Sequence, residues 1–481
     1  MNMVNAQKIT ANTSFFMIAL IGQKILSFIY FTILARSLGA EATGQYFFAI
    51  SFATMFAVLV DLGLSPVLIR QVAKDQEGGQ RWFQQILTLK LMLALATAIF
   101  LVLLNSFLFY SDQVRNLIYI TTLITIIDSF TLLFYAYIRG KQSLKYESWG
   151  TIIFQLIVMI LGLSMLSLTH SVAVFLTVLL AASLFNFIFS LAILKSKWQV
   201  KFQMLYDRAF IKNISLLTLP FALSAIFAKI YAYIDTFFLK MFMGDAAVGF
   251  YSIAYKLTFA LQFIPLAFVA ALYPAFSNYF KNDQQALEKT FVKSFNYLAF
   301  ISVPLSLGII ALAPNLVDKM YTSQFHFSIF PLQVLIASIP FLFVNFSLSS
   351  FLNATNRQKI NTRNLGLTMV LNIILNLILI RVLGIWGASL SSSISTLFLF
   401  SLNLYAVLSV VKPKADEFAP VIKTVMSGLI MLFAIGFLQD YIVWYWTILA
   451  GAVIYLGFML LTRAISKQDF VFIKNSLTKA Q

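Results

Sequence analysis

The sequence predicts an all-α polytopic membrane protein with about 14 transmembrane helices, arranged as two parallel-related six-helix lobes followed by two further helices. Three observations lead to this prediction. Of the 481 residues, 60% are apolar and only 11% are charged, whereas soluble domains carry about a quarter charged residues. The apolar residues gather in runs of roughly 20, the length that crosses a bilayer as a helix. The sequence of one predicted hydrophobic hairpin also occurs twice in the chain, in two similar copies.

The apolar runs place the predicted helices in chain order. Their centres lie near residues 24, 52, 94, 124, 158, 182, 228, 258, 302, 340, 371, 396, 428 and 452. We expect a first lobe at 1–200, a second at 208–412, and the last two spans at 413–481. The opening residues, MNMVNAQKITANTSFF, lack a short apolar core that ends in a cleavage site. We therefore expect an uncleaved start that runs into the first span.

Basic residues alternate between the two sides of the predicted helices. One side holds 25 of the 34 lysines and arginines. The other side holds five, namely Arg36, Arg115, Lys240, Lys319 and Arg381. Because cationic loops resist translocation, the rich side is predicted to be cytoplasmic, with both termini inside. The net charge of +17 thus reflects topology, and no nucleic-acid partner is expected.

The repeated hairpin covers Ile21–Ala49 and Ile226–Ala254, which lie 205 residues apart and agree at ten of 29 aligned positions. The shared residues include the pairs Lys24/Lys229, Gly39/Gly244, Gly44/Gly249 and Tyr46/Tyr251. Six spans separate the copies, so the chain returns to the same side of the membrane. The lobes are therefore predicted to be related by an axis along the membrane normal, with a substrate site between them near the midplane. The glycines fit a tight outer turn and close helix packing.

Two lysines lie deep in the repeated hairpins. Lys24 and Lys229 are each about 16 Å from the inner end of their span at 1.5 Å per residue. A charge that faced lipid at this depth would cost at least about 2.5–3.5 kcal/mol. The lysines could form buried ion pairs that orient helices, or they could form a shared anion site. Neither has an acidic residue three or four positions away, which favours the anion site.

Five other charged residues fall within or at the ends of the predicted spans. Asp235 and Lys256 lie at comparable depths on consecutive helices, and we expect them to form an ion pair. Lys90 and Asp128 are interpreted in the same way. Proton or ion coupling is the alternative for both pairs. Asp61, in VDLGLSP, is expected to be a helix-end or gating residue.

The sequence contains few of the residues that catalysis and metal binding need. It has no cysteine and only two histidines, which excludes disulfides and thiolate or histidine-rich metal sites. It has no GxxxxGK[ST] stretch for ATP, no HExxH and no Ser-His-Asp grouping. The predicted outer loops are short, which disfavours a membrane glycosyl polymerase or ligase. We therefore expect a transporter that is not an enzyme and carries no cofactor or metal.

Several stretches together resemble a known family. They are LARSLGAEATGQYFFA, DLGLSPVLIRQVAK, YIDTFFLKMFMGDAAVGFYSIAYKL, NATNRQKINTRNLGLTMVLNIILNLILI and GIWGASLSSSIS. In this order they resemble the polysaccharide transporter family (Wzx-type O-antigen flippases) of the multidrug/oligosaccharidyl-lipid/polysaccharide exporter superfamily. The resemblance implies alternating access in a bacterial inner membrane. The implied cargo is an undecaprenyl-diphosphate-linked oligosaccharide (O-antigen, capsule or similar repeat unit), moved from the cytoplasmic to the periplasmic leaflet.

The resemblance also implies site residues and partners. Members line a central cavity with cations on the first and seventh helices, and the matching positions here are Lys24 and Lys229. Asp235 matches an acidic position on the seventh helix. The implied partners are the lipid-linked oligosaccharide, membrane lipid, a polysaccharide polymerase and a chain-length regulator. A drug or cation exporter of the same fold remains the alternative within this class, and a glycosyl polymerase or ligase remains the alternative outside it.

Overall fold

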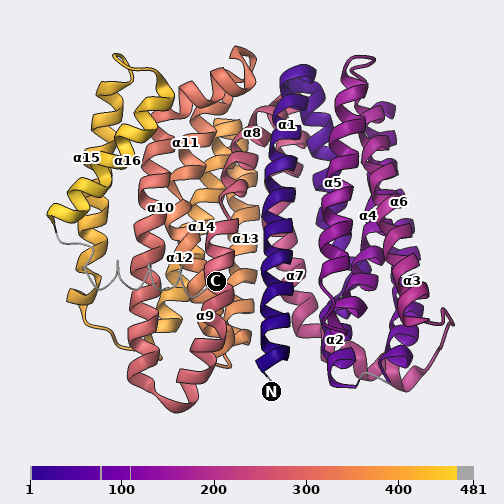
Figure 1. Cartoon of the computed structure of the whole chain (residues 1–481). Helices are drawn as coiled ribbons and strands as arrows, with labels where there is room; N and C mark the ends of the chain where they lie inside the picture. The colour runs from indigo at the N-terminus through magenta and orange to yellow at the C-terminus, as the bar shows by residue number, and fades with distance from the viewer. Residues whose placement is uncertain (1–2, 76–77, 109, 463–481) are drawn as a thin grey trace. The chain divides into compact units, whose positions relative to one another are not determined.

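The computed structural model describes residues 3–75, 78–108 and 110–462, and every regular element in these ranges is a helix (Figure 1). The chain divides into two compact units, Met1–Ser252 and Ile253–Gln481, and the division falls within α8. The predicted all-α class is therefore confirmed.

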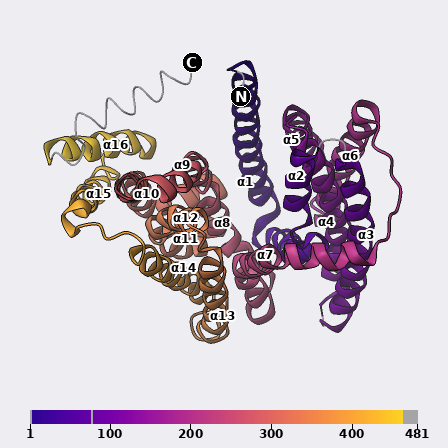
Figure 2. The ribbon, with the colours of Figure 1, turned by 90° about the horizontal axis from the view of Figure 1, so that it is seen from below.

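The first unit is built around α4. Its helices are α1 (Met3–Asp61), α2 (Leu64–Lys74), α3 (Gly79–Phe107), α4 (Asp112–Gly140), α5 (Lys145–Leu166), α6 (Val172–Trp198), α7 (Arg208–Met243) and the start of α8 (Asp245–Ala260). Seen along the helices, α4 lies among α2, α3, α5 and α6 (Figure 2). Helix α1 packs against α4, α5 and α7. Helix α7 begins where the Asp207 carboxylate accepts hydrogen bonds from the backbone N–H groups of Ala209 and Phe210, as an N-cap residue does.

The second unit contains the remaining helices. They are the end of α8, then α9 (Phe263–Asn282), α10 (Gln284–Tyr321), the 3₁₀ turn η1 (Ser323–Ser328), α11 (Ile329–Ala337), α12 (Ile339–Ala354), α13 (Gln358–Leu383), α14 (Ile385–Leu408), the 3₁₀ turn η2 (Ala415–Phe418), α15 (Ala419–Leu438) and α16 (Trp444–Leu461). Helix α12 packs against α9, α10 and α14, and α15 packs on both α10 and α16.

The number of spans agrees with the prediction. Among the described residues, 12 helices are long and apolar enough to cross a membrane, and the bent pair Ser323–Ala337 and Ile339–Ala354 brings the number to 13. The first candidate, Phe15–Asp61, is 47 residues long, about 70 Å at 1.5 Å per residue and twice a bilayer core. It breaks at Gly39. Dividing it there adds one span, which gives the 14 predicted.

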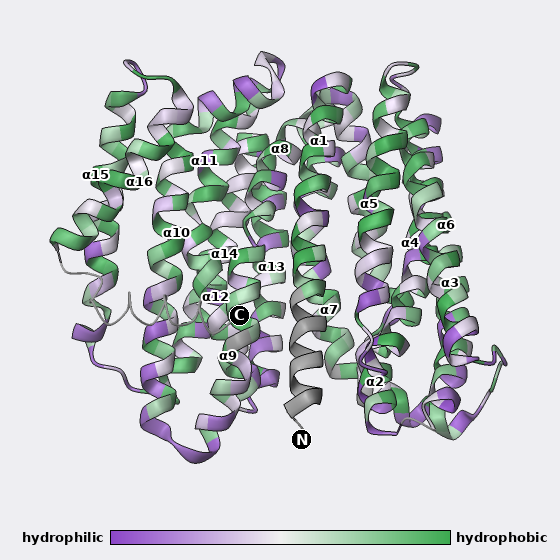
Figure 3. Ribbon diagram, in the orientation of Figure 1, coloured by the Kyte–Doolittle hydropathy of each residue, from purple (hydrophilic) through white to green (hydrophobic). Residues whose placement is uncertain are grey.

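Hydropathy follows the helices closely. Figure 3 shows hydrophobic residues along the helix lengths and hydrophilic residues gathered at helix ends and in connecting loops. The run lengths of apolar residues do not predict the short helix α2. Its 11 residues are too few to span a bilayer, and its apolar face is buried in the first unit through Leu64, Val67, Leu68 and Val72.

The lobe boundaries stay a prediction. The repeat assigns α7 to a second lobe at 208–412, whereas the compact units place α7 with the first six predicted spans. The compact units are defined by packing and the lobes by the repeat, so neither division tests the other. The predicted boundaries of the first lobe, 1–200, and of the last two spans, 413–481, also stay predictions.

Candidate functional site

The two copies of the hairpin turn in the same way. Gly39 has φ 78° and ψ 178°, and Gly244 has φ 84° and ψ −170°. This backbone conformation is essentially restricted to glycine. The sequence identity at these positions therefore has a direct cause, because each glycine allows the chain to reverse between two antiparallel spans.

The second pair of glycines brings the two turns into contact. A Cβ atom on Gly44 would lie 1.8 Å from the carbonyl oxygen of Asp245, and one on Gly249 would lie 1.9 Å from the carbonyl oxygen of Ala40. Ala40 and Asp245 are themselves equivalent in the 205-residue repeat. The two contacts are therefore the same contact seen from each copy. Only glycine allows the backbones to approach this closely.

Polar side chains surround this contact. The Lys240 ammonium lies 2.5 Å from Asp245 Oδ1, and both side chains are nearly buried. Gln45 donates to Asp245 Oδ2 at 3.3 Å, and Gln113 donates to Gln45 Oε1 at 3.1 Å. The ion pair and the amides join α1, just after its break at Gly39, to α4, α7 and α8.

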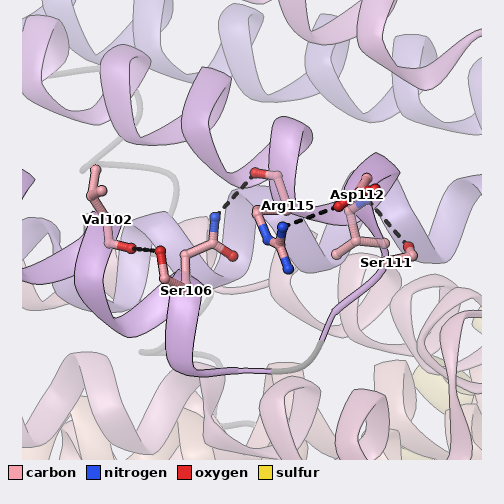
Figure 4. A network of polar contacts seen from close by, with 7 residues as sticks. Val102, Ser106, Ser111, Asp112 and Arg115 are labelled. Carbon is pink, nitrogen blue, oxygen red and sulfur yellow. Dashed lines mark hydrogen bonds and ion pairs between the residues drawn. The ribbon is translucent and has the colours of Figure 1, made fainter.

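A second cation predicted on the outer side, Arg115, also pairs with a carboxylate. Arg115 Nη1 donates to Asp112 Oδ1 at 3.0 Å, beside the Ser106 and Ser111 hydroxyls at the turn between α3 and α4 (Figure 4). Two of the five basic residues predicted on the outer side, Arg115 and Lys240, are therefore paired with carboxylates.

Lys24 and Lys229 occupy matched positions in the two hairpins. Each lies 15 residues before its turn glycine, about 22 Å along the helix. The Lys24 side chain is exposed and that of Lys229 is half-buried. The Lys229 ammonium lies 5.7 Å from the centre of the Tyr233 ring, one turn further along α7. Next to Lys24, Gln23 donates to Gln155 of α5 at 3.3 Å, which fixes the rotation of α1.

Asp235 is buried, with 2% of its surface exposed. Its Oδ2 accepts a hydrogen bond from the Tyr251 hydroxyl at 2.7 Å. The equivalent residues in the first copy are Tyr30 and Tyr46, which are also buried. The sequence indicated Tyr251 only as a shared residue of the repeat, and the structure shows that its hydroxyl binds the Asp235 carboxylate. The predicted pairing of Asp235 with Lys256 stays a prediction, because Lys256 lies in the other unit.

The predicted pair of Lys90 with Asp128 is wrong. The Lys90 ammonium, fully buried, lies 2.5 Å from Asp61 Oδ1. The same carboxylate accepts from the Ser65 hydroxyl at 2.5 Å. Asp61 is the last residue of α1, so it joins that helix end to both α2 and α3. The Asp128 side chain, in the middle of α4, is exposed.

No metal cluster is evident in the described part of the chain, since no three His, Cys, Asp or Glu side chains are grouped there as ligands. Among the charged residues within the helices, Lys90 and Asp61 form an ion pair. Lys24 and Lys229 lie at equivalent positions of the repeat. The roles predicted for Lys24, Lys229, Asp235, Lys256 and Asp128 stay predictions.

Comparisons with known proteins give the chain a family and a fold. It is 26% identical over 173 residues to a probable low-salt glycan biosynthesis flippase, Agl15, of Haloferax volcanii, a match that spans 36% of this chain and 37% of that protein. It is 22% identical over 389 residues to the capsular polysaccharide biosynthesis protein CapF of Staphylococcus aureus, which covers 80% of this chain and 95% of that one.

Among solved structures, the fold is similar to that of the lipid II flippase MurJ in an inward closed conformation. The TM-score is 0.77 at 18% identity, over 93% of this chain and 98% of that one. The family model described as MatE matches residues 220–378. The family model described as polysaccharide biosynthesis protein matches residues 9–280, which is more than half of the chain. The chain therefore belongs to the polysaccharide biosynthesis protein family, as the resemblance of its motifs predicts.

Proposed function

We propose that this protein is a flippase. Its cargo is an oligosaccharide joined through a diphosphate to undecaprenol, and the movement runs from the cytoplasmic to the periplasmic leaflet of a bacterial inner membrane by alternating access. The observation that carries the proposal is the pair Lys24 and Lys229, two cations at the same depth of two repeated hairpins. The family membership and the names of the relatives support the same cargo class.

The chemistry of the cargo fits this pair. A diphosphate carries its charge at the junction between sugar and lipid, and it must leave water to cross the bilayer. Two ammonium groups at mid-depth offset that loss of hydration, because electrostatic attraction is strong where water is scarce. The polyprenyl tail can stay in the lipid throughout. The lysines bind an anion and release it, and no covalent step is required.

A drug or cation exporter of the same fold is the alternative within this class. Such a protein is expected to direct carboxylates toward its cargo. Here the Asp235 carboxylate is buried and hydrogen-bonded to Tyr251, and the Asp61 carboxylate is bonded to Lys90. Both of these carboxylates are thus engaged with protein groups rather than directed toward a cationic cargo, whereas the Asp128 carboxylate in the middle of α4 is exposed.

The test replaces Lys24, Lys229 or both with glutamine, in a host whose own flippase gene is deleted. Glutamine keeps polarity but removes the charge. A hydrogen bond to a charged group contributes about 1.5–3 kcal/mol, so each variant should reduce surface polysaccharide by about tenfold or more. Immunoblots should show near-normal abundance of the protein. Lys→Arg at either position should retain most activity, because the charge remains.

Lys90→Gln is the matched control within the membrane. Because Lys90 is bonded to Asp61, its loss should deplete the protein from the membrane rather than leave it abundant and inactive. Full surface polysaccharide from an abundant Lys24→Gln, Lys229→Gln double variant would exclude the anion site.

A further inference from the structure

Two lysines converge on one tyrosine ring at the predicted cytoplasmic end of the first unit. The Lys197 ammonium lies 4.6 Å from the centre of the Tyr146 ring, and the Lys145 ammonium lies 5.1 Å from it. The two nitrogens are therefore at most 9.7 Å apart, the sum of these two distances. Lys197 also donates to the Tyr146 hydroxyl at 2.8 Å. The Trp198 ring lies 5.1 Å from the same ammonium.

No carboxylate neutralises this group in the described part of the chain. The nearest acidic residue along α5 is Glu147, which is buried and bonded through both oxygens to Arg139, one of them at 2.6 Å. The ion pairs formed by the described residues do not include Lys145, Lys195 or Lys197. Like charges repel, so an arrangement that holds two ammonium groups around one ring favours an anion that can accept from both.

The position of the cluster points to a lipid rather than a soluble anion. Lys145 and Tyr146 begin α5, and Lys197 and Trp198 end α6. Both helices are candidate membrane spans that pack against each other. The four residues therefore lie at one membrane face, at the depth of lipid headgroups. Tyrosine and tryptophan are enriched at this depth.

An exposed apolar stripe continues from the cluster toward the bilayer centre. Lys145, Trp149, Leu156 and Ile160 follow one another along α5 at intervals of four, seven and four residues, which places them on one helix face. The exposed fractions of the last three are 52%, 40% and 65%. On α6, Leu184 and Ile188 are also exposed. Acyl chains can lie along this surface while a phosphate occupies the position between the ammonium groups.

We propose that Lys145, Lys197 and Tyr146 form a binding site for the phosphate of an anionic glycerophospholipid of the phosphatidylglycerol type, with its acyl chains along the exposed stripe of α5. Basic pockets between transmembrane helices on the cytoplasmic side suit such headgroups. This site is separate from Lys24 and Lys229, and it stands whether or not the chain is a flippase.

The test is native mass spectrometry of the purified full chain, titrated with phosphatidylglycerol or with phosphatidylcholine of the same acyl chains. The wild-type protein should bind the first phosphatidylglycerol preferentially. Each lysine near an anionic headgroup is worth about fivefold in affinity, the equivalent of about 1 kcal/mol. Lys145→Gln should therefore weaken binding about fivefold, and the double variant with Lys197→Gln about 30-fold. Phosphatidylcholine binding should not change.

The matched control removes two exposed lysines from the predicted cytoplasmic side of the second unit, Lys281→Gln with Lys289→Gln. It lowers the net charge equally and should leave phosphatidylglycerol binding within about twofold of wild type, since each exposed surface charge outside the cluster contributes only a few tenths of a kcal/mol. Lys145 is exposed and belongs to none of the ion pairs formed by the described residues, so the single variant keeps the test valid if the double variant is unstable. Wild-type affinity in the double variant, or an equal loss in the control, would overturn the site. Displacement of the lipid by inorganic phosphate would assign it to a soluble anion instead and would also overturn the proposal.

Discussion

Replacing Gly44 with alanine should force the outer ends of the two hairpins apart. The new Cβ atom would lie 1.8 Å from the Asp245 carbonyl oxygen, whereas real Cβ atoms essentially never come closer than 3.0 Å. The backbones must therefore separate by at least 1.2 Å, the difference between these two distances. Both contacting groups are backbone atoms on helices, so no side-chain rotation can relieve the overlap.

The loss of folding stability in Gly44→Ala can be compared with a control substitution, Gly22→Ala, in the same helix. Overpacking costs about 1–3 kcal/mol, and an overlap with backbone belongs at the upper end. Replacing a glycine within a helix by alanine stabilises the helix by about 1 kcal/mol, because alanine has the higher helix propensity. Gly22→Ala should show only this stabilisation, because nothing lies within 4 Å of its new Cβ atom. The two variants of α1 should therefore differ in stability by about 3 kcal/mol.

Two measurements test this prediction. Thermal unfolding in detergent should give Gly44→Ala a lower Tm than wild type, and Gly22→Ala an equal or higher one. Thr43 is 2% exposed, so a cysteine placed there should resist an impermeant thiol reagent in the wild-type background and react once Gly44 is alanine. Equal Tm values for the two alanine variants, together with an unreactive Thr43→Cys, would refute the close contact.

Two further predictions concern topology and the inner ion pair. Single cysteines at Glu41 and Ser196, both exposed, should differ in intact cells: an impermeant reagent should label only the first, and labelling of the second would overturn the predicted orientation. Lys90→Met should destabilise the protein by about 3 kcal/mol because it leaves the Asp61 carboxylate unpaired. The double variant with Asp61→Asn should recover most of that loss in Tm, and no recovery would mean that the pair is not what stabilises this end of α1.

The sequence predicts well the features that depend on position along a helix. Apolar run length places the spans, and two glycines in each copy mark the turn that the structure shows at Gly39 and Gly244. Depth along a helix also follows from residue number, because each residue adds a fixed rise. For this reason the sequence alone predicts an equal depth for Lys24 and Lys229.

Features that depend on rotation and neighbours cannot be predicted in the same way. The adjacent order of their spans favours a pair between Lys90 and Asp128, but the Lys90 side chain meets Asp61 instead. Residue number fixes how deep a side chain lies, whereas the choice of partner depends on which face of the helix it occupies and on the bend after α1. Helix α2 provides that bend, and it is too short for an apolar run to reveal.

The two hairpins share a backbone turn but differ at most of their side chains, and one of these differences bears on the proposed function. Tyr30 of the first copy corresponds to Asp235 of the second, while the tyrosine opposite each is kept as Tyr46 and Tyr251. Symmetric lysines suit a cargo with two phosphate groups, since each copy can present one cation. A carboxylate present in only one copy cannot serve that symmetric purpose. Asp235, buried and hydrogen-bonded to Tyr251, therefore has a role other than holding the two phosphates: the pair with Lys256 stays the prediction for it, and proton or ion coupling stays the alternative.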